Sequence, residues 1–288
     1  MRTALSTLEV VRPRTLDEAL AALASEPRPT PLAGGTDLLV YLNAGTLDAR
    51  RYLDLGGLPA LRGIRAGRES VTLGALTTFS EIRAHPLLRR RLPALAAAAA
   101  EVGAWAIQNR ATLGGNIANA SPAGDSLPVL LAHEAIVHAR SWHAERVIDY
   151  GALHTGYRTL ALAPDELITA ITVPFPPRDV TTFFRKVGTR RAQSISKVVF
   201  CGWLQLDAKG RVSESRLAYG SMAPVPVRAT SAETAFAGRP PLEALADARA
   251  ALERDLTPID DVRSDREYRM TVAGRLLEQL VRNALALR

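Results

Sequence analysis

Cysteine is almost absent from this chain of 288 residues, since Cys201 is the only one. A single thiol cannot form an internal disulfide, and it cannot supply the set of thiolates that holds an iron–sulfur cluster. Lysine is scarce too, because only three of the 36 basic residues are lysines. The net charge of +7 is scattered and forms no basic stripe interleaved with aromatic residues. The sequence therefore predicts neither an iron–sulfur protein nor a nucleic-acid-binding protein.

Long apolar runs are missing as well. The longest, LPALAAAAA at 92–100, is closed by Glu101, whereas a membrane-spanning helix needs about 20 apolar residues. The first residues contain no sustained apolar stretch before a cleavage site, so we expect no signal peptide and a cytoplasmic protein. The hydrophobic content of 47% still allows a sizeable core, in one large domain or two moderate ones.

Several common functional motifs are also absent. The chain contains no GxGxxG, no GxxxxGK[ST], no GxSxG and no HExxH, so a Rossmann or P-loop nucleotide site is unsupported. His133, His138 and His143 recur at intervals of five, which fits neither one face of a helix nor a known ligand pair. We therefore predict no metal site.

The first half of the chain alternates helix-like and strand-like segments. Thr15 and Glu18 form a capping-box pattern ahead of a helix, and Thr78 and Glu81 form a second one. Further segments are expected as strands at 30–33, 51–55 and 70–76 and as helices at 37–45 and 92–102.

A break is visible at TVPFPPRD, residues 172–179, where three prolines fall within four residues. Proline interrupts regular structure, so we place a domain boundary there. Beyond it, two alternating strands joined by a turn at 207–210 predict a half-buried sheet, and helices follow. Ser264 and Glu267 form a capping-box pattern at the start of the last helix.

Two Gly-Gly turns carry the functional signal. In PLAGGTDLL at 31–39, Gly34 and Gly35 lead into Thr36 and Asp37, which are typical first residues of a helix. Backbone N–H groups converge at such a helix start, and the absent side chains let an anion approach closely. The alternative is a tight strand-to-helix turn that binds nothing.

The second turn lies in ATLGGNIANASPAGDSLP at 111–128. Asn116 and Asn119 add uncharged donors, and its glycines keep the backbone accessible. Asp125 is a candidate acceptor for a ribose or another ligand donor, or else a cap for the helix that follows. Together the two turns predict a diphosphate held from two sides.

The chain resembles a known family at this point. AGGTDLL, TLGGNIANASPAGDSLPVLLA, GYRTLALAPDELITAITVPFP and EYRMTVAGRLLEQLV are similar to the FAD-binding, or medium, subunits of molybdenum hydroxylases of the xanthine dehydrogenase and carbon monoxide dehydrogenase family. The resemblance implies an α+β fold: a vanillyl-alcohol-oxidase (PCMH)-type FAD-binding domain at 1–176, with subdomains at about 1–56 and 57–176. A smaller C-terminal domain at 177–288, with a three-stranded antiparallel sheet and helices, would follow.

The resemblance also implies a set of FAD-binding positions. The first motif would wrap the diphosphate, and the second would bind from the facing side. Ile168 would pack on the flavin ring and Lys186 would lie near it, where a core isoleucine and a solvated lysine are the alternatives. The implied cofactor-binding residues are Leu32, Ala33, Gly34, Gly35, Thr36, Asp37, Leu38, Leu39, Thr112, Gly114, Gly115, Asn116, Asn119, Asp125, Ile168 and Lys186.

By the same resemblance, a large partner subunit would hold the molybdopterin cofactor and a small one two [2Fe-2S] clusters, and this chain would pass electrons to NAD or another acceptor. RRLPAL and SDREYR look more similar to the xanthine dehydrogenase branch than to carbon monoxide, nicotinate or aldehyde dehydrogenases. Two other classes remain as alternatives, a stand-alone flavin oxidase and an assembly scaffold that has lost FAD. The flavin would carry the chemistry, so no catalytic residue is predicted.

Overall fold

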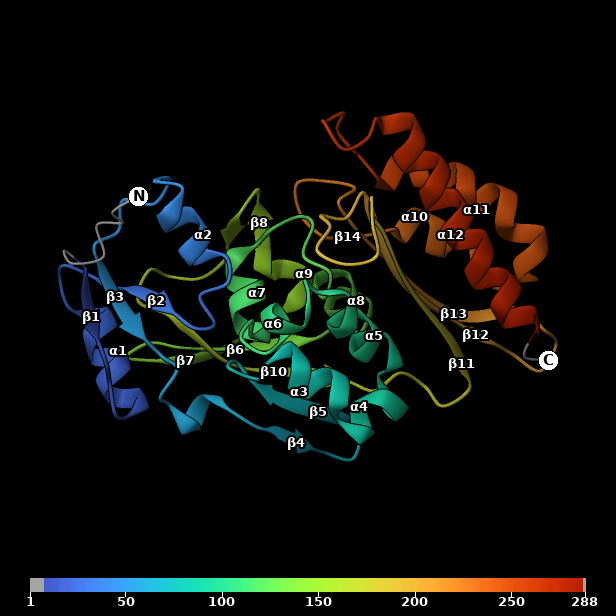
Figure 1. Ribbon diagram of the computed structural model, residues 1–288. Helices are drawn as coiled ribbons and strands as arrows, with labels where there is room; N and C mark the ends of the chain where they lie inside the picture. Colours follow the sequence, from blue (N-terminus) through green and yellow to red (C-terminus); the bar gives the residue numbers. More distant parts are fainter. Residues whose placement is uncertain (1–7, 287–288) are drawn as a thin grey trace.

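The computed structural model describes residues 8–286, and it contains three main sheets, each with its own set of helices (Figure 1). The first sheet is parallel, in the order β1-β3-β2. Its elements are β1 Glu9–Val11, α1 Leu16–Ala24, β2 Thr30–Leu32, α2 Leu38–Asn43 and β3 Arg51–Asp54. Helix α1 begins where predicted, because the Thr15 hydroxyl accepts the Glu18 amide, and it buries Leu20 and Leu23 against β3. The predicted capping box is only half formed, since the Glu18 carboxylate accepts the Arg14 amide and not that of Thr15.

The second sheet is antiparallel, in the order β4-β5-β10-β6-β7. Its strands are β4 Ile64–Ala66, β5 Ser70–Gly74, β6 Ile136–Arg140, β7 Glu145–Asp149 and β10 Leu167–Pro174. One apolar core joins this sheet to the helices drawn above it in Figure 1. These helices are α3 Phe79–Ala84, α4 Pro86–Arg91, α5 Pro93–Glu101, α6 Trp105–Gln108, α7 Leu113–Asn119, α8 Leu127–Ala132 and α9 Tyr150–Leu153. Two short strands, β8 His154–Gly156 and β9 Thr159–Leu160, pair separately, and a 3-10 helix spans Pro59–Leu61.

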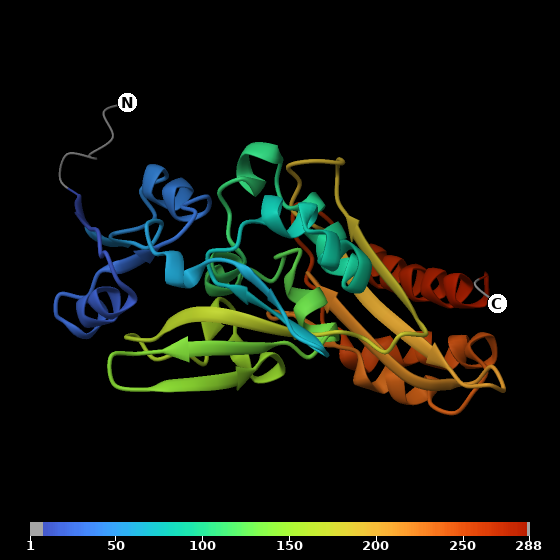
Figure 2. The same ribbon diagram turned by 90° about the horizontal axis from the view of Figure 1, so that it is seen from below.

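The third sheet follows the proline-rich break, between the end of β10 at Pro174 and the start of β11 at Val180. It contains the three long antiparallel strands that were expected, and a two-residue strand, β14, extends its edge. The elements are β11 Val180–Val187, β12 Val198–Leu206, β13 Val212–Gly220, β14 Val227–Arg228, α10 Thr230–Phe236, α11 Pro241–Asp255 and α12 Arg266–Ala286. Viewed from below, the first sheet, the second and the third with its helices follow one another along the molecule (Figure 2).

The prediction that this third sheet is half-buried is wrong for its inner strand β12. In β12 both faces are covered, because Phe200 and Leu204 pack into the core formed with α10–α12, whereas Cys201 packs into the core of the second sheet and its helices. Helices α5 and α8 thus press on one face and α12 on the other. The C-terminal sheet is therefore packed against α5 and α8, and this packing places β11 beside a cavity.

The start of α12 also differs from the expectation. Asp265, one residue after the predicted cap Ser264, accepts the Tyr268 amide with its carboxylate at 2.7 Å. The Thr78 and Glu81 capping box, in contrast, forms in both directions at the start of α3. Among residues 8–286, none of the helices combines the length and the hydropathy that crossing a bilayer requires.

Candidate functional site

A cavity of about 780 Å³ opens where the first sheet, the helices of the second sheet and strand β11 meet. Both Gly-Gly motifs line it, together with residues far away in the sequence. A volume of this size is typical of small-molecule and cofactor sites, which span roughly 300 to 1,000 Å³. The cavity is therefore the candidate functional site.

The first Gly-Gly turn is pressed directly onto the segment that precedes the second. A Cβ atom on Gly34 would lie 2.0 Å from the Arg110 carbonyl oxygen and 3.0 Å from the Ala111 Cα. Gly35 has φ +74°, a conformation that side chains other than glycine rarely adopt. Leu32 and Leu39 are absent from the cavity lining, and their side chains instead lie 3.3 Å from the position of a Gly35 Cβ. The two glycines thus bring the motifs together.

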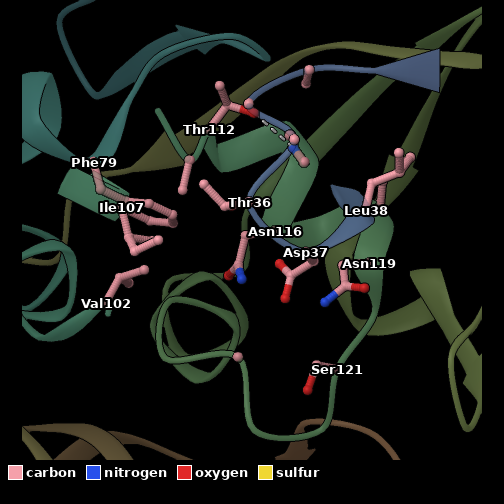
Figure 3. A pocket seen from close by; sticks show the side chains of 18 of the residues that line it. Thr36, Asp37, Leu38, Phe79, Val102, Ile107, Thr112, Asn116, Asn119 and Ser121 are labelled. Atoms are coloured by element: carbon pink, nitrogen blue, oxygen red, sulfur yellow. Dashed lines mark hydrogen bonds between the residues drawn. The ribbon is translucent and has the colours of Figure 1, made fainter. Parts of the chain in front are cut away.

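Asp37 precedes α2 but does not cap it, since its side chain makes no capping hydrogen bond. The carboxylate instead lies at the cavity, beside Asn116 and Asn119 in Figure 3. Burial raises the pKa of Asp37, and the Arg158 guanidinium opposes that rise. The predicted capping role of this residue is therefore not realised, and its carboxylate remains available as an acceptor.

The second Gly-Gly turn begins helix α7. The Thr112 hydroxyl accepts the Gly115 amide at 3.1 Å, which satisfies one of the free amides at the helix start. A Cβ atom on Gly114 would lie 2.7 Å from the Ala75 Cβ, so this glycine is required for packing against the chain after β5. At Gly115 a Cβ atom would meet the Thr112 hydroxyl at 2.8 Å and the Ala33 Cβ at 3.7 Å. The two adjacent glycines thus fit against different neighbours.

The two asparagines of α7 have their side-chain oxygens engaged. Asn116 accepts the Ser126 hydroxyl at 2.8 Å, and Asn119 accepts the Tyr41 hydroxyl and the Arg158 guanidinium, both at 3.4 Å. This arrangement leaves the amide nitrogens as the groups that can donate to a ligand.

Asp125 and Lys186 form a buried ion pair at the cavity wall. The Lys186 Nζ donates to Asp125 Oδ2 at 2.7 Å and to the Glu101 carbonyl at 2.9 Å, and the side chains are only 8% and 5% exposed for Asp125 and Lys186 respectively. Among the described residues, Asp125 Oδ1 is buried and has no hydrogen-bond partner. Burial raises the pKa of Asp125 to about 6, although the Lys186 charge opposes the shift. Asp125 Oδ1 is thus able to accept a hydrogen bond from a ligand, and the Asp125 side chain does not cap α8.

Ile168 lines the cavity from β10 and is 6% exposed. It lies at an irregularity of the sheet, because the pairing of β10 with β6 shifts between Ile168 and Ala170. Such bulges redirect a side chain away from its regular position. Lys186 and Ile168 thus reach the cavity from different sheets.

Several lining residues were not predicted from the sequence. Phe79, Val102 and Ile107 are among them and gather on one side of the cavity, opposite the predicted Asp37, Asn116 and Asn119 and the Ser121 of the second motif (Figure 3). Tyr41, Arg158, Leu162 and the segment 193–195 complete the walls. Only Arg158 had a local signal, as an arginine in the short TGYRT turn. The rest are ordinary apolar or loop residues whose role depends on the packing.

The residues present fit a long ligand with an aromatic part and an anionic part. The apolar side can accept a ring system, and the glycine backbones and asparagine amides suit a diphosphate. Asp125 Oδ1, which has no partner among the described residues, can accept a hydrogen bond from a hydroxyl or an N–H group of the ligand. Within residues 8–286 there is no cluster of three or more His, Cys, Asp or Glu residues that could bind a metal ion.

Known protein families match nearly the whole chain. A family described as "FAD binding domain in molybdopterin dehydrogenase" matches residues 6–176, and one described as "CO dehydrogenase flavoprotein C-terminal domain" matches residues 183–284. The putative xanthine dehydrogenase FAD-binding subunit of Escherichia coli (strain K12) is 32% identical over 278 residues, which cover 96% of this chain and 95% of the relative. The nicotinate dehydrogenase FAD-subunit of Eubacterium barkeri is 30% identical over 81% of this chain and 80% of its own length.

Solved structures show the same similarity in three dimensions. A chain of carbon monoxide dehydrogenase from Hydrogenophaga pseudoflava, in a form that lacks the Mo-pyranopterin moiety of its cofactor, superimposes with a TM-score of 0.91 at 27% identity and covers 97% of each chain. A chain of the reconstituted enzyme from Oligotropha carboxidovorans gives 0.92 at 25% identity, covering 97% of this chain and 98% of its own. The similarity therefore extends over all three sheets.

Proposed function

This chain belongs to the family of FAD-binding medium subunits of molybdenum hydroxylases, and on that premise we propose that it carries electrons from the [2Fe-2S] clusters of a small partner subunit to NAD or another acceptor. A large partner subunit would bind the molybdopterin cofactor and hydroxylate the substrate. The proposed complex is a xanthine dehydrogenase, because two E. coli xanthine dehydrogenase FAD-binding subunits share 32% identity with this chain, whereas the carbon monoxide dehydrogenase medium chain of H. pseudoflava shares 26%.

One observation carries the cofactor assignment: the two Gly-Gly motifs, about eighty residues apart in the sequence, line the same cavity. We propose that the first motif, from Ala33 to Leu38, and the second, from Thr112 to Asn119, hold the FAD diphosphate between them. Gly34 supports this arrangement because it allows direct contact of the first motif with the segment before the second.

The flavin ring would lie on the apolar side of the cavity, beside Ile168 and the Asp125–Lys186 pair. Bound FAD supplies both one-electron and two-electron chemistry, so the chain itself needs no general acid or base for the transfer. Ile168 and the neighbouring apolar side chains would exclude water from the ring. Lys186 would contribute little net charge there, because Asp125 neutralises it.

The main rival is a stand-alone flavin oxidase. Purification of this chain from cells that express its natural neighbours distinguishes the two. We expect a complex that contains molybdenum, iron and FAD, which oxidises xanthine or a related N-heterocycle. A single chain that reduces its FAD with an organic substrate and without metal-containing partners would contradict the proposed function.

The isolated chain is expected to bind FAD and to contain no stoichiometric metal. The reason is the paired glycine motifs around one cavity and the single buried cysteine, Cys201. An absorption spectrum of the purified protein, with metal analysis of the same sample, checks both parts. Protein that stays colourless after incubation with FAD, or that carries stoichiometric iron, would overturn the assignment.

A further inference from the structure

Arg158 occupies a special position at the edge of the cavity. It lies in the turn between β8 and β9 with φ +53°, a conformation that is rare for residues other than glycine and asparagine. Its guanidinium lies 5.2 Å from the ring centroid of Tyr41, a residue of α2, and donates to Asn119 Oδ1 at 3.4 Å. Arg158 thus contacts α2, which follows the first Gly-Gly motif, and α7, which contains the second.

The charges around the cavity single out this arginine. Five side chains with full charges line the cavity: Asp37, Asp125, Glu166, Arg158 and Lys186. Two of the carboxylates already have cationic partners, since Lys186 pairs with Asp125 at 2.7 Å and Arg146, outside the lining, pairs with Glu166 at 2.6 Å. Among the described lining residues, Arg158 is therefore the one basic side chain with no carboxylate within 4.0 Å.

A diphosphate needs such a charge. Glycine amides and asparagine side chains are neutral donors, and the Asp37 carboxylate lies in the same part of the cavity (Figure 3). Placing a doubly ionised diphosphate near a carboxylate is unfavourable unless a cation balances the two. The planar guanidinium can donate two parallel N–H groups to two phosphate oxygens in a fixed fork, a geometry that the ammonium group of a lysine does not hold.

We propose that Arg158 binds the diphosphate of FAD and supplies the positive charge that the two Gly-Gly motifs lack. The inference rests on the proposed function, because it assumes that the cavity holds FAD. Tyr41 and Asn119 act as positioning residues: the ring of Tyr41 stacks on the guanidinium, and the Asn119 oxygen fixes its orientation. The unusual backbone conformation of the turn is consistent with a functional position.

The test compares two probes, FAD and riboflavin, which share the ring system and its ribityl chain, whereas riboflavin lacks the diphosphate and the adenosine attached to it. Arg158→Gln is expected to weaken FAD binding by roughly tenfold to a hundredfold, the range for a lost hydrogen bond to a charged group, and to leave riboflavin binding unchanged. Arg158→Lys should restore part of the FAD affinity, because it restores the charge without the fork. Arg68→Gln, in the exposed turn between β4 and β5, is the matched control and should change neither. Isothermal titration measures both affinities.

Salt gives a second readout. The FAD affinity of the wild-type protein should fall as ionic strength rises, and this dependence should be weaker in Arg158→Gln, because a screened charge has been removed. Equal losses for FAD and riboflavin would show that Arg158 only holds the fold together, and unchanged FAD affinity would also overturn the proposal. If the wild-type protein binds neither probe, the proposed function itself fails, which is a separate outcome.

Discussion

Replacing Lys186 by methionine is expected to lower the free energy of unfolding of the apo chain by about 3 kcal/mol at pH 8, the lower end of the range for breaking a buried ion pair. The loss arises because the Asp125 carboxylate, 8% exposed, would remain in the interior without its partner. Urea denaturation of wild type and variant measures the difference. The effect is large for one residue, because a domain is stabilised by only about 5 to 15 kcal/mol in total.

The double variant Lys186→Met with Asp125→Asn tests whether the loss of stability comes from the unpaired Asp125 charge or from the lost packing of the lysine side chain. Removing both charges should restore most of the lost stability, since a buried ion pair contributes little once its desolvation is counted. The control is Arg282→Met, which breaks an exposed pair with Glu278 on α12 and should cost about 0.5 kcal/mol or less. A double variant as unstable as the single one would show that Lys186 stabilises the chain by packing alone.

The pH dependence of the Lys186→Met effect has a definite sign. The folded-state pKa of Asp125, about 6, lies above its value of 3.8 in an unfolded chain, so its ionised form costs stability as the pH rises through this interval. Without Lys186 the folded-state pKa rises further, and the cost at high pH grows. The difference between wild type and variant should therefore be larger at pH 8 than at pH 5. A difference that is independent of pH would mean that Asp125 is not ionised in the wild-type pair.

Gly34→Ala is expected to weaken FAD binding by about tenfold to a hundredfold, which corresponds to roughly 1 to 3 kcal/mol of strain. The added Cβ would lie 2.0 Å from the Arg110 carbonyl oxygen. That atom belongs to the backbone, so it cannot move aside as a flexible side chain would. The first motif must then separate from the second, and a ligand held by both loses contacts on one side.

Gly57→Ala is the matched control, because a Cβ at Gly57 would have no heavy atom within 4 Å. It should bind FAD like the wild-type protein. Circular dichroism of Gly34→Ala should show that the sheets persist, so that the lost affinity reports on the site. Wild-type affinity in a folded Gly34→Ala protein would mean that close contact of the two motifs is not required for binding.

Local sequence patterns predicted local structure well where the interaction is itself local. The Thr78 and Glu81 capping box forms because both partners lie within one turn of α3. At α12 the same pattern predicted the wrong cap. Asp265, one residue after Ser264, accepts the Tyr268 amide, because serine and aspartate are both good caps and the backbone path into the helix selects between them. A sequence pattern thus predicts that a helix begins in a region better than it predicts which residue caps the helix.

The site was predicted unevenly, and for a physical reason. Both glycine motifs could be found by sequence because close backbone approach requires glycine and leaves a visible pattern. The pairing of Lys186 with Asp125, 61 residues apart, could not, since neither residue has a neighbour that specifies the other. From the sequence, Lys186 was expected to lie near the flavin ring or to be solvated. The structure shows a buried lysine whose charge is paired with Asp125.

Short sequence patterns, and residues that only one conformation tolerates, were enough to predict the family, the two glycine motifs and part of the order of helices and strands, whereas strands such as β6, β7 and β10 were not predicted. Which side chains share the cavity depends on the tertiary packing. Phe79, Ile168, Lys186 and Arg158 come from four separate segments, and they meet because the third sheet packs against α5 and α8 while the first sheet presses Gly34 onto Arg110. Burial and charge compensation arise only from that packing, since they depend on every neighbour at once and not on the residues adjacent in sequence.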